Sequence, residues 1–150
     1  MKKYLIITLC LSILVLSCGD SKKGNKDQAK TEKESPIQDT KLTESIKRGS
    51  AVYKDFCFAC HLPNGVGVSG AFPPLAKSDF LIKNREESIK AIKFGMTGEV
   101  VVNGETYNSV MTPLGLSDEE VADVMNYITN SWGNKNNTII TTKEVSEIQQ

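Results

Sequence analysis

Hydrophobic and polar positions divide the chain into four stretches. Residues 4–16 form an almost continuous apolar run, whereas residues 19–40 are almost entirely polar. Apolar residues at helical spacing return between residues 41 and 133, and residues 134–150 are again polar and rich in Asn and Thr. This pattern predicts an apolar leader, a polar linker, one folded domain and a polar C-terminal tail that is either unstructured or a short edge segment.

A first helix is predicted over residues 43–56. Thr43 is suited to its N-cap position, and Ile46, Gly49 and Tyr53 share one helical face. Because Gly within a helix costs about 1 kcal/mol relative to Ala, Gly49 suggests that another backbone approaches closely at this point.

The last helix has the strongest pattern and is predicted over residues 117–130. Ser117 and Glu120 have the spacing of a capping box at its start. An apolar stripe follows at positions i, i+3, i+4 and i+7, formed by Val121, Val124, Met125 and Ile128.

The segment between these helices is mostly irregular. Residues 62–76 are rich in Gly and Pro and predict a loop. Short helices are predicted at residues 78–83 and 84–94, the second with a capping-box pattern at Asn84. Residues 100–107 could form a small hairpin with a turn at Asn103-Gly104. The domain is therefore predicted to be all-α, with three to four short helices and long loops.

The first helix leads directly into Cys57-Phe58-Ala59-Cys60-His61, a C-x-x-C-H pattern that predicts attachment of a c-type haem. The thiols of Cys57 and Cys60 would form thioethers with two vinyl groups, and the imidazole of His61 would bind the iron. A covalently held haem would also complete the core of a domain this small.

Two other roles for this pattern have less support. A structural zinc site needs four Cys or His ligands, but the chain offers only Cys10 and Cys18 outside the pattern, and His61 is its only His. A thioredoxin-like dithiol is expected near a βαβ unit, and no strand-rich stretch precedes Cys57.

Residues 1–17 have the features of a bacterial signal peptide. Two lysines precede an apolar run of 13 residues, which is too short for a spanning helix of about 20 residues. The run ends in Val15-Leu16-Ser17-Cys18, which resembles a lipobox, so we expect cleavage before Cys18 and a lipid on its sulfur; an ordinary secretory signal is the alternative. Lipidated Cys18 and the flexible linker, residues 18–40, would then hold the domain at a membrane surface.

Charge argues against nucleic acid as a partner. The chain has 18 Lys and Arg against 18 Asp and Glu, and loss of Lys2 and Lys3 with the signal leaves 16 against 18. A nearly neutral protein lacks the basic field that nucleic acid binding requires.

The order of helices and motif is similar to that of class I cytochromes c. Gly49 and Tyr53 match the first helix of that family, and Tyr127 matches the last helix, which crosses the first. Residues 48–133 resemble small monohaem domains that accompany bacterial oxidases, nitrite reductases and dehydrogenases. The matching segments are residues 67–75, 102–111 and 116–133. This resemblance implies the class I cytochrome c fold, wrapped around one covalent haem c.

The resemblance also implies the axial ligands of the iron. His61 would bind one face, and Met111 would bind the other, because it precedes Thr112-Pro113 in the setting that the family uses for its axial Met. Met96, in a loop after the helix predicted at residues 84–94, is an alternative ligand. Met125 is explained by packing on the apolar face of the last helix.

Pro73 resembles the family proline whose carbonyl oxygen accepts a hydrogen bond from Nδ1 of the axial His. Its other explanation is that Pro73-Pro74 only stiffens the loop. Tyr107, Asn108 and Trp132 could contact the haem propionates or the Met sulfur, or could simply line the haem crevice.

An iron with both axial positions filled favours electron transfer over catalysis. We therefore expect a membrane-anchored monohaem cytochrome in the bacterial cell envelope, on the periplasmic or outer side of a membrane, with no small-molecule substrate. Its partners would be redox proteins such as a terminal oxidase, a nitrite reductase or a dehydrogenase. The alternatives are a peroxidase or sensor with an open iron site, and a protein in which haem only stabilises the fold.

Overall fold

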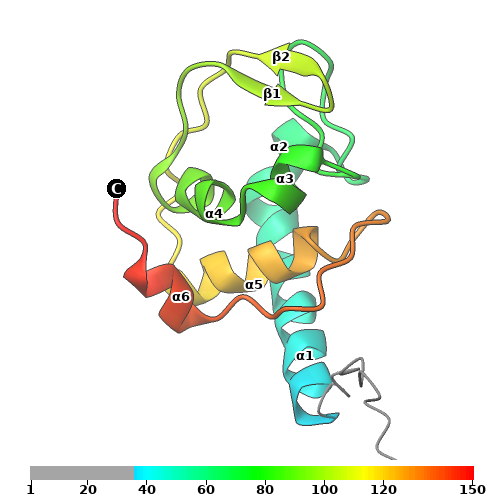
Figure 1. Ribbon diagram of the computed structural model, residues 1–150, viewed down its shortest axis with the longest axis vertical. Coiled ribbons are helices and arrows are strands. Elements are labelled where there is room, and N and C mark those ends of the chain that lie inside the picture. Colours follow the sequence, from blue (N-terminus) through cyan, green and yellow to red (C-terminus); the bar gives the residue numbers. More distant parts are fainter. Residues whose placement is uncertain (1–35) are drawn as a thin grey trace, which may run out of the picture. The chain divides into compact units, whose positions relative to one another are not determined.

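The computed structural model describes residues 36–150 (Figure 1). The expected signal peptide, Cys18 and the linker up to residue 35 lie outside the described residues. Within residues 36–150, no helix has the length and apolar character that crossing a membrane would require.

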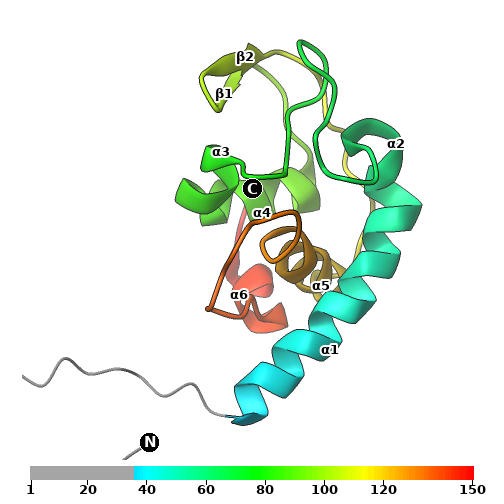
Figure 2. The same ribbon diagram turned by 90° about the vertical axis from the view of Figure 1, so that its right-hand side faces the viewer.

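One continuous helical rod ends in the C-x-x-C-H motif. It consists of α1 (Pro36–Val52), a π-helical turn η1 (Tyr53–Cys57) and α2 (Phe58–His61), and it runs along one side of the domain (Figure 2). The rod begins at Pro36 rather than after Thr43, so the prediction of a flexible linker is wrong for residues 36–40. Proline is well suited to the first turn of a helix, because its missing N–H would have no helical partner there.

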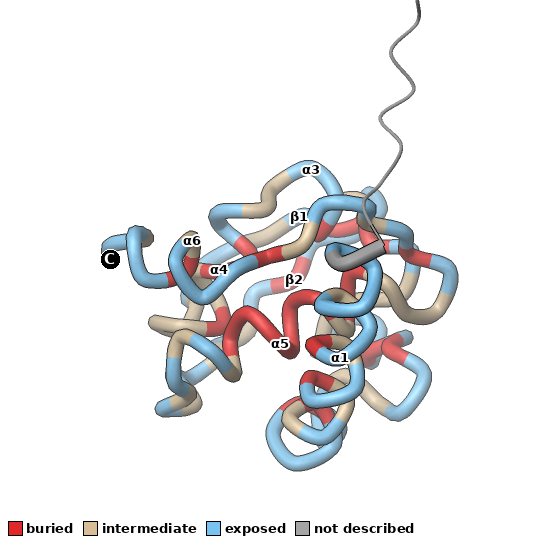
Figure 3. The backbone as a smooth tube through the Cα atoms, turned by 90° about the horizontal axis from the view of Figure 1, so that it is seen from below, coloured by how far each residue is buried: buried red, intermediate tan, exposed pale blue. Residues whose placement is uncertain are grey.

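Helix α5 (Asp118–Ile128) crosses the rod and is buried along most of its length (Figure 3). Its start has the predicted capping box between Ser117 and Glu120. At the crossing, a Cβ atom on Gly49 would collide with the backbone carbonyl of Asp123 and would lie 2.9 Å from Cβ of Tyr127. The close approach predicted from Gly49 is therefore confirmed.

The crossing also contains a buried carboxylate. Asp123 is 4% exposed, and its oxygens accept hydrogen bonds from Oγ of Ser45 and Nε of Arg48, both at 2.6 Å. Both donors come from α1, so these bonds join α1 to α5. They also satisfy a charge that would otherwise be costly to bury.

The middle of the chain forms two short helices and a hairpin. Helices α3 (Asp79–Lys83) and α4 (Arg85–Phe94) agree with the prediction, but Asn84 makes no side-chain cap and instead donates to the carbonyl of Phe80. Strands β1 (Val100–Val102) and β2 (Glu105–Tyr107) pair antiparallel, with Val102 opposite Glu105. Asn103 and Gly104 both have positive φ, at 53° and 82°, as the two central residues of a type I′ turn require.

The C-terminal stretch is part of the fold, so the prediction of an unstructured tail or a short edge segment at residues 134–150 is wrong. It contains helix α6 (Thr142–Glu147), and its Ile140 and Val145 are buried in the hydrophobic core. The side-chain amide of Asn126 in α5 makes two hydrogen bonds to the backbone of Ile140. Its Oδ1 accepts from the Ile140 N–H and its Nδ2 donates to the Ile140 carbonyl, each at 2.8 Å. A few apolar residues, widely separated by polar ones, are therefore enough to dock this segment.

Candidate functional site

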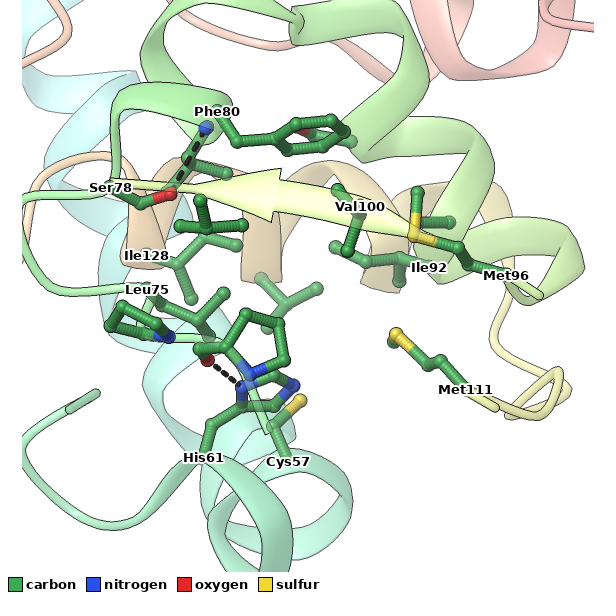
Figure 4. A pocket seen from close by; sticks show the side chains of 17 residues that line it. Cys57, His61, Leu75, Ser78, Phe80, Ile92, Met96, Val100, Met111 and Ile128 are labelled. Carbon is green, nitrogen blue, oxygen red and sulfur yellow. Dashed lines mark hydrogen bonds between the residues drawn. The ribbon is translucent and has the colours of Figure 1, made fainter. Parts of the chain in front are cut away.

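An apolar cavity opens beside His61 (Figure 4). It holds about 650 Å³, open solvent included. A second hollow of about 710 Å³ shares six lining residues with the first, so the two are parts of one crevice. The shared residues are Cys57, His61, Pro73, Met96, Val100 and Met111. No Lys, Arg, Asp or Glu lines either hollow, and this apolar wall suits the flat apolar ring of a haem.

The two cysteines of the motif lie at the end of the rod, against this crevice. Cys57 lines both hollows and is 8% exposed, whereas Cys60 lines the second hollow and is exposed. Burial raises the pKa of the Cys57 thiol to about 11. Both sulfurs are thus free thiols on one wall of the crevice, which is the arrangement needed to bond two neighbouring groups of one cofactor.

The imidazole of His61 is held by the carbonyl that the resemblance implies. Nδ1 of His61 lies 3.0 Å from the carbonyl oxygen of Pro73, and only a protonated Nδ1 can donate this hydrogen bond. Burial lowers the pKa of His61, although the bond to Pro73 opposes that effect. The neutral ring with its proton on Nδ1 leaves the lone pair of Nε2 available to a metal.

A glycine allows the loop to bring Pro73 to His61. Gly67 has φ of +63°, and a Cβ at this position would collide with the carbonyl of Phe72 and lie 2.7 Å from the carbonyl oxygen of Pro73. The N–H of Gly67 donates to the carbonyl of His61 at 3.1 Å. The glycine-rich composition of the loop therefore permits a close backbone contact beneath the imidazole.

Both candidate methionine ligands lie on the opposite wall. Met96 and Met111 form an isolated antiparallel bridge, with N–H to carbonyl distances of 2.8 and 2.9 Å in the two directions. Figure 4 shows the Met111 thioether directed into the crevice across from His61, whereas the Met96 thioether lies beside Val100. Met125 is fully buried in α5 and lines neither hollow of the crevice.

The hairpin closes one side of the crevice with Val100 and Val102. Glu105 fastens it to the facing loop by accepting from Oγ of Ser69 at 2.7 Å and from the N–H of Gly70 at 2.9 Å. The hydrogen bonds from Ser69, from the Tyr107 hydroxyl and from Gly70 hold the pKa of the Glu105 carboxyl below its usual range. No signal in the sequence indicates this attachment, because the partners are more than 30 residues apart and neither belongs to a recognisable motif.

The three residues considered for propionate or sulfur contacts do not line the crevice. The Tyr107 hydroxyl donates to Glu105 at 2.9 Å. Trp132 packs against Tyr53 and Tyr127, with ring centroids 5.0 and 5.4 Å apart. Asn108 is exposed. Tyr107 and Trp132 therefore serve the hairpin and the helix crossing in this structure.

Comparisons with known proteins agree with this geometry. A family model described as Cytochrome c matches residues 46–132. The chain is 42% identical over 90 residues to cytochrome c-552 of Thermus thermophilus, which is 57% of this chain and 68% of that protein.

Two further relatives are subunits of larger enzymes. The chain is 30% identical over 105 residues to the cytochrome c subunit of an alcohol dehydrogenase (quinone) from Gluconobacter oxydans, which is 67% of this chain but 22% of that subunit. It is 31% identical over 111 residues to the gluconate 2-dehydrogenase cytochrome c subunit of Pantoea cypripedii, which is 71% of this chain and 25% of that subunit. The chain thus spans about a quarter or less of the length of these two relatives.

Proposed function

Because this chain belongs to the cytochrome c family, we propose that it is a membrane-anchored electron carrier whose haem iron is bound by His61 and Met111. As a member of this family it holds one haem c covalently through Cys57 and Cys60, and it is an electron-transfer protein rather than an enzyme. The haem supplies an iron that exchanges single electrons when it is bound. His61 would bind that iron, and the apolar side chains of the crevice would surround the haem.

The hydrogen bond between His61 and Pro73 is the observation that carries the proposal. It fixes the imidazole in the tautomer that can bind iron and sets the orientation of the ring. The thioether of Met111 enters the same crevice from the opposite wall (Figure 4). A thioether ligand favours Fe(II) and raises the reduction potential, and it also closes the iron to substrates.

The pair Met96 and Met111 offers a matched test of the sixth ligand. Both side chains line the same crevice and both backbones belong to the same bridge. Met96→Ala and Met111→Ala therefore remove the same side-chain volume from the same crevice. We expect Met111→Ala to retain covalent haem, to lose the weak near-infrared sulfur-to-iron band of the oxidised protein and to lower the reduction potential. Met96→Ala should keep the band.

The opposite result for the two variants would show that Met96 is the ligand. A wild-type protein that lacks the band and contains high-spin iron at neutral pH would instead contradict methionine ligation altogether. That spectrum would favour the open iron site of a peroxidase or sensor.

The anchor and the partners belong to the same proposal. The sequence around Cys18 supports a lipid anchor and a place in the bacterial cell envelope. Two relatives carry names of dehydrogenase cytochrome subunits, which supports a dehydrogenase as redox partner. A terminal oxidase and a nitrite reductase are the other partners that we propose, from the family resemblance. Replacing Cys18 with Ser should release the haem protein from the membrane fraction, and crosslinking of the lipidated form should identify the partner.

A further inference from the structure

We propose that the hydroxyl group of Tyr53 positions the imidazole of His61 by holding the next residue, Leu62, in a backbone conformation that leucine rarely adopts. The inference rests on the proposed function, in which His61 binds the iron. Tyr53 lies in the π-helical turn before the C-x-x-C-H motif and does not line the crevice, so it would act through the backbone rather than by contact with the haem.

Leu62 is the residue at which the rod ends. Its φ is 62° and its ψ is 161°, a combination that is almost confined to glycine because a Cβ atom crowds the backbone there. Such a conformation persists only where the surroundings hold it in place. Leu62 is bonded directly to His61, so the backbone angles of Leu62 determine the direction of the chain after His61.

The carbonyl of Leu62 has two donors. The Tyr53 hydroxyl donates to it at 2.6 Å and the N–H of Gly65 at 3.1 Å. Tyr53 is 2% exposed, so the donor side of this bond is shielded from water. Burial raises the pKa of Tyr53, which keeps the hydroxyl protonated as a donor.

The same turn also supports the loop that carries Pro73, whose carbonyl accepts the hydrogen bond from the His61 imidazole. The carbonyl of Gly65 accepts from the N–H groups of Leu75 and Ala76, both at 2.8 Å, and these residues follow closely after Pro73. The turn that contains Leu62 is therefore joined both to His61 and to the loop whose Pro73 carbonyl accepts from Nδ1. A shift of the Leu62 carbonyl would disturb both.

Tyr127 provides the matched control. Its ring packs 5.4 Å from that of Tyr53, in the same aromatic cluster, but among the described residues no hydrogen bond is found for its hydroxyl. Tyr53→Phe and Tyr127→Phe each remove one oxygen atom from this cluster, and only the first removes the bond to Leu62.

The experiment uses the haem-loaded protein and measures two properties of the iron site, with Tyr127→Phe as the control for general packing. These are the reduction potential and the exchange rate of the His61 Nδ1 proton, observed by NMR among the paramagnetically shifted ring signals. We expect Tyr53→Phe to shift the potential and to speed exchange roughly fivefold, the factor that corresponds to one ordinary hydrogen bond. Tyr127→Phe should leave both at their wild-type values.

A second background tests the mechanism. Glycine adopts the Leu62 backbone angles without crowding, so Leu62→Gly alone should retain the wild-type potential, and Tyr53→Phe should have a smaller effect when combined with it. If Tyr53→Phe alone does not retain haem, the double variant should restore haem retention.

Equal behaviour of Tyr53→Phe and Tyr127→Phe would overturn the inference, and so would an undiminished effect or unrestored haem in the Leu62→Gly background. Failure of the proposed function looks different. In that case, the wild-type protein itself would lack the shifted signals of an iron-bound imidazole.

Discussion

Replacement of Gly49 by Ala tests whether the contact between α1 and α5 limits the stability of the domain. Two effects of the added methyl group oppose each other. Alanine favours a helix over glycine by about 1 kcal/mol, so an exposed substitution would stabilise the protein. At Gly49, however, the new Cβ would collide with the Asp123 carbonyl and lie 2.9 Å from Cβ of Tyr127.

The structure indicates which effect dominates. The new methyl group would meet backbone atoms of Asp123 and the Cβ of Tyr127. These atoms cannot rotate away as the end of a long side chain could. The helices would have to separate, and this would stretch the hydrogen bonds from Ser45 and Arg48 to Asp123. Overpacking of a core costs roughly 1–3 kcal/mol and occasionally more. With both helices anchored by this buried carboxylate, we expect a cost near the upper end, and a net destabilisation of about 2 kcal/mol after the helix preference is subtracted.

Thermal unfolding of the haem-loaded protein, followed by circular dichroism, provides the assay. For a domain of this size a loss of 2 kcal/mol corresponds to a fall in Tm of roughly 8 °C or more. Lys47→Ala is the control, because Lys47 is an exposed residue of the same helix and its replacement should leave Tm nearly unchanged. A Gly49→Ala protein as stable as wild type, or more stable, would refute the reasoning.

Two further predictions concern the C-terminal segment and the hairpin. Ile140 is 2% exposed, so Ile140→Ala should destabilise the protein by about 2–5 kcal/mol in chemical denaturation, whereas Ile139→Ala, at a partly exposed neighbour, should cost clearly less; equal losses would contradict docking of residues 134–150. The pKa of Glu105 in the folded protein lies below its usual value of 4.5. The ionised carboxylate therefore stabilises the fold above pH 4.5, and this contribution is lost as the pH falls through the lower pKa of the folded protein. Exchange protection of the Gly70 amide should fall over that acidic range, and Glu105→Gln should abolish the pH dependence; an unchanged profile in the variant would assign it to another group.

Local signals predicted those parts of the fold that neighbouring residues determine. Ser117 and Glu120 cap α5 within one turn, and Asn103-Gly104 supplies both positive φ angles of the hairpin turn. The π-helical turn at Tyr53–Cys57 had no such signal, because its residues are compatible with an ordinary helix. The strained angles of Leu62 were equally hidden, since nothing in its own side chain favours them.

The sequence by itself determined the attachment chemistry of this protein. Two thiols and an imidazole within five residues are sufficient to specify a covalent haem site, because the reacting groups are neighbours along the chain. It also determined helix α5, through an apolar stripe whose spacing is a property of a single helix, and Gly49 predicted that another backbone approaches α1 closely.

Only the tertiary structure placed the distant residues around the motif. It brought the Pro73 carbonyl to His61, placed Met96 and Met111 on one wall, and docked Ile140 and Val145 in the core. These contacts depend on side chains and backbones that meet only after folding, and their free energies come from burial and from hydrogen bonds across long separations in sequence. The polar composition of residues 134–150 therefore gave no sign that helix α6 docks against the core, whereas the five residues from Cys57 to His61 were enough to specify the cofactor.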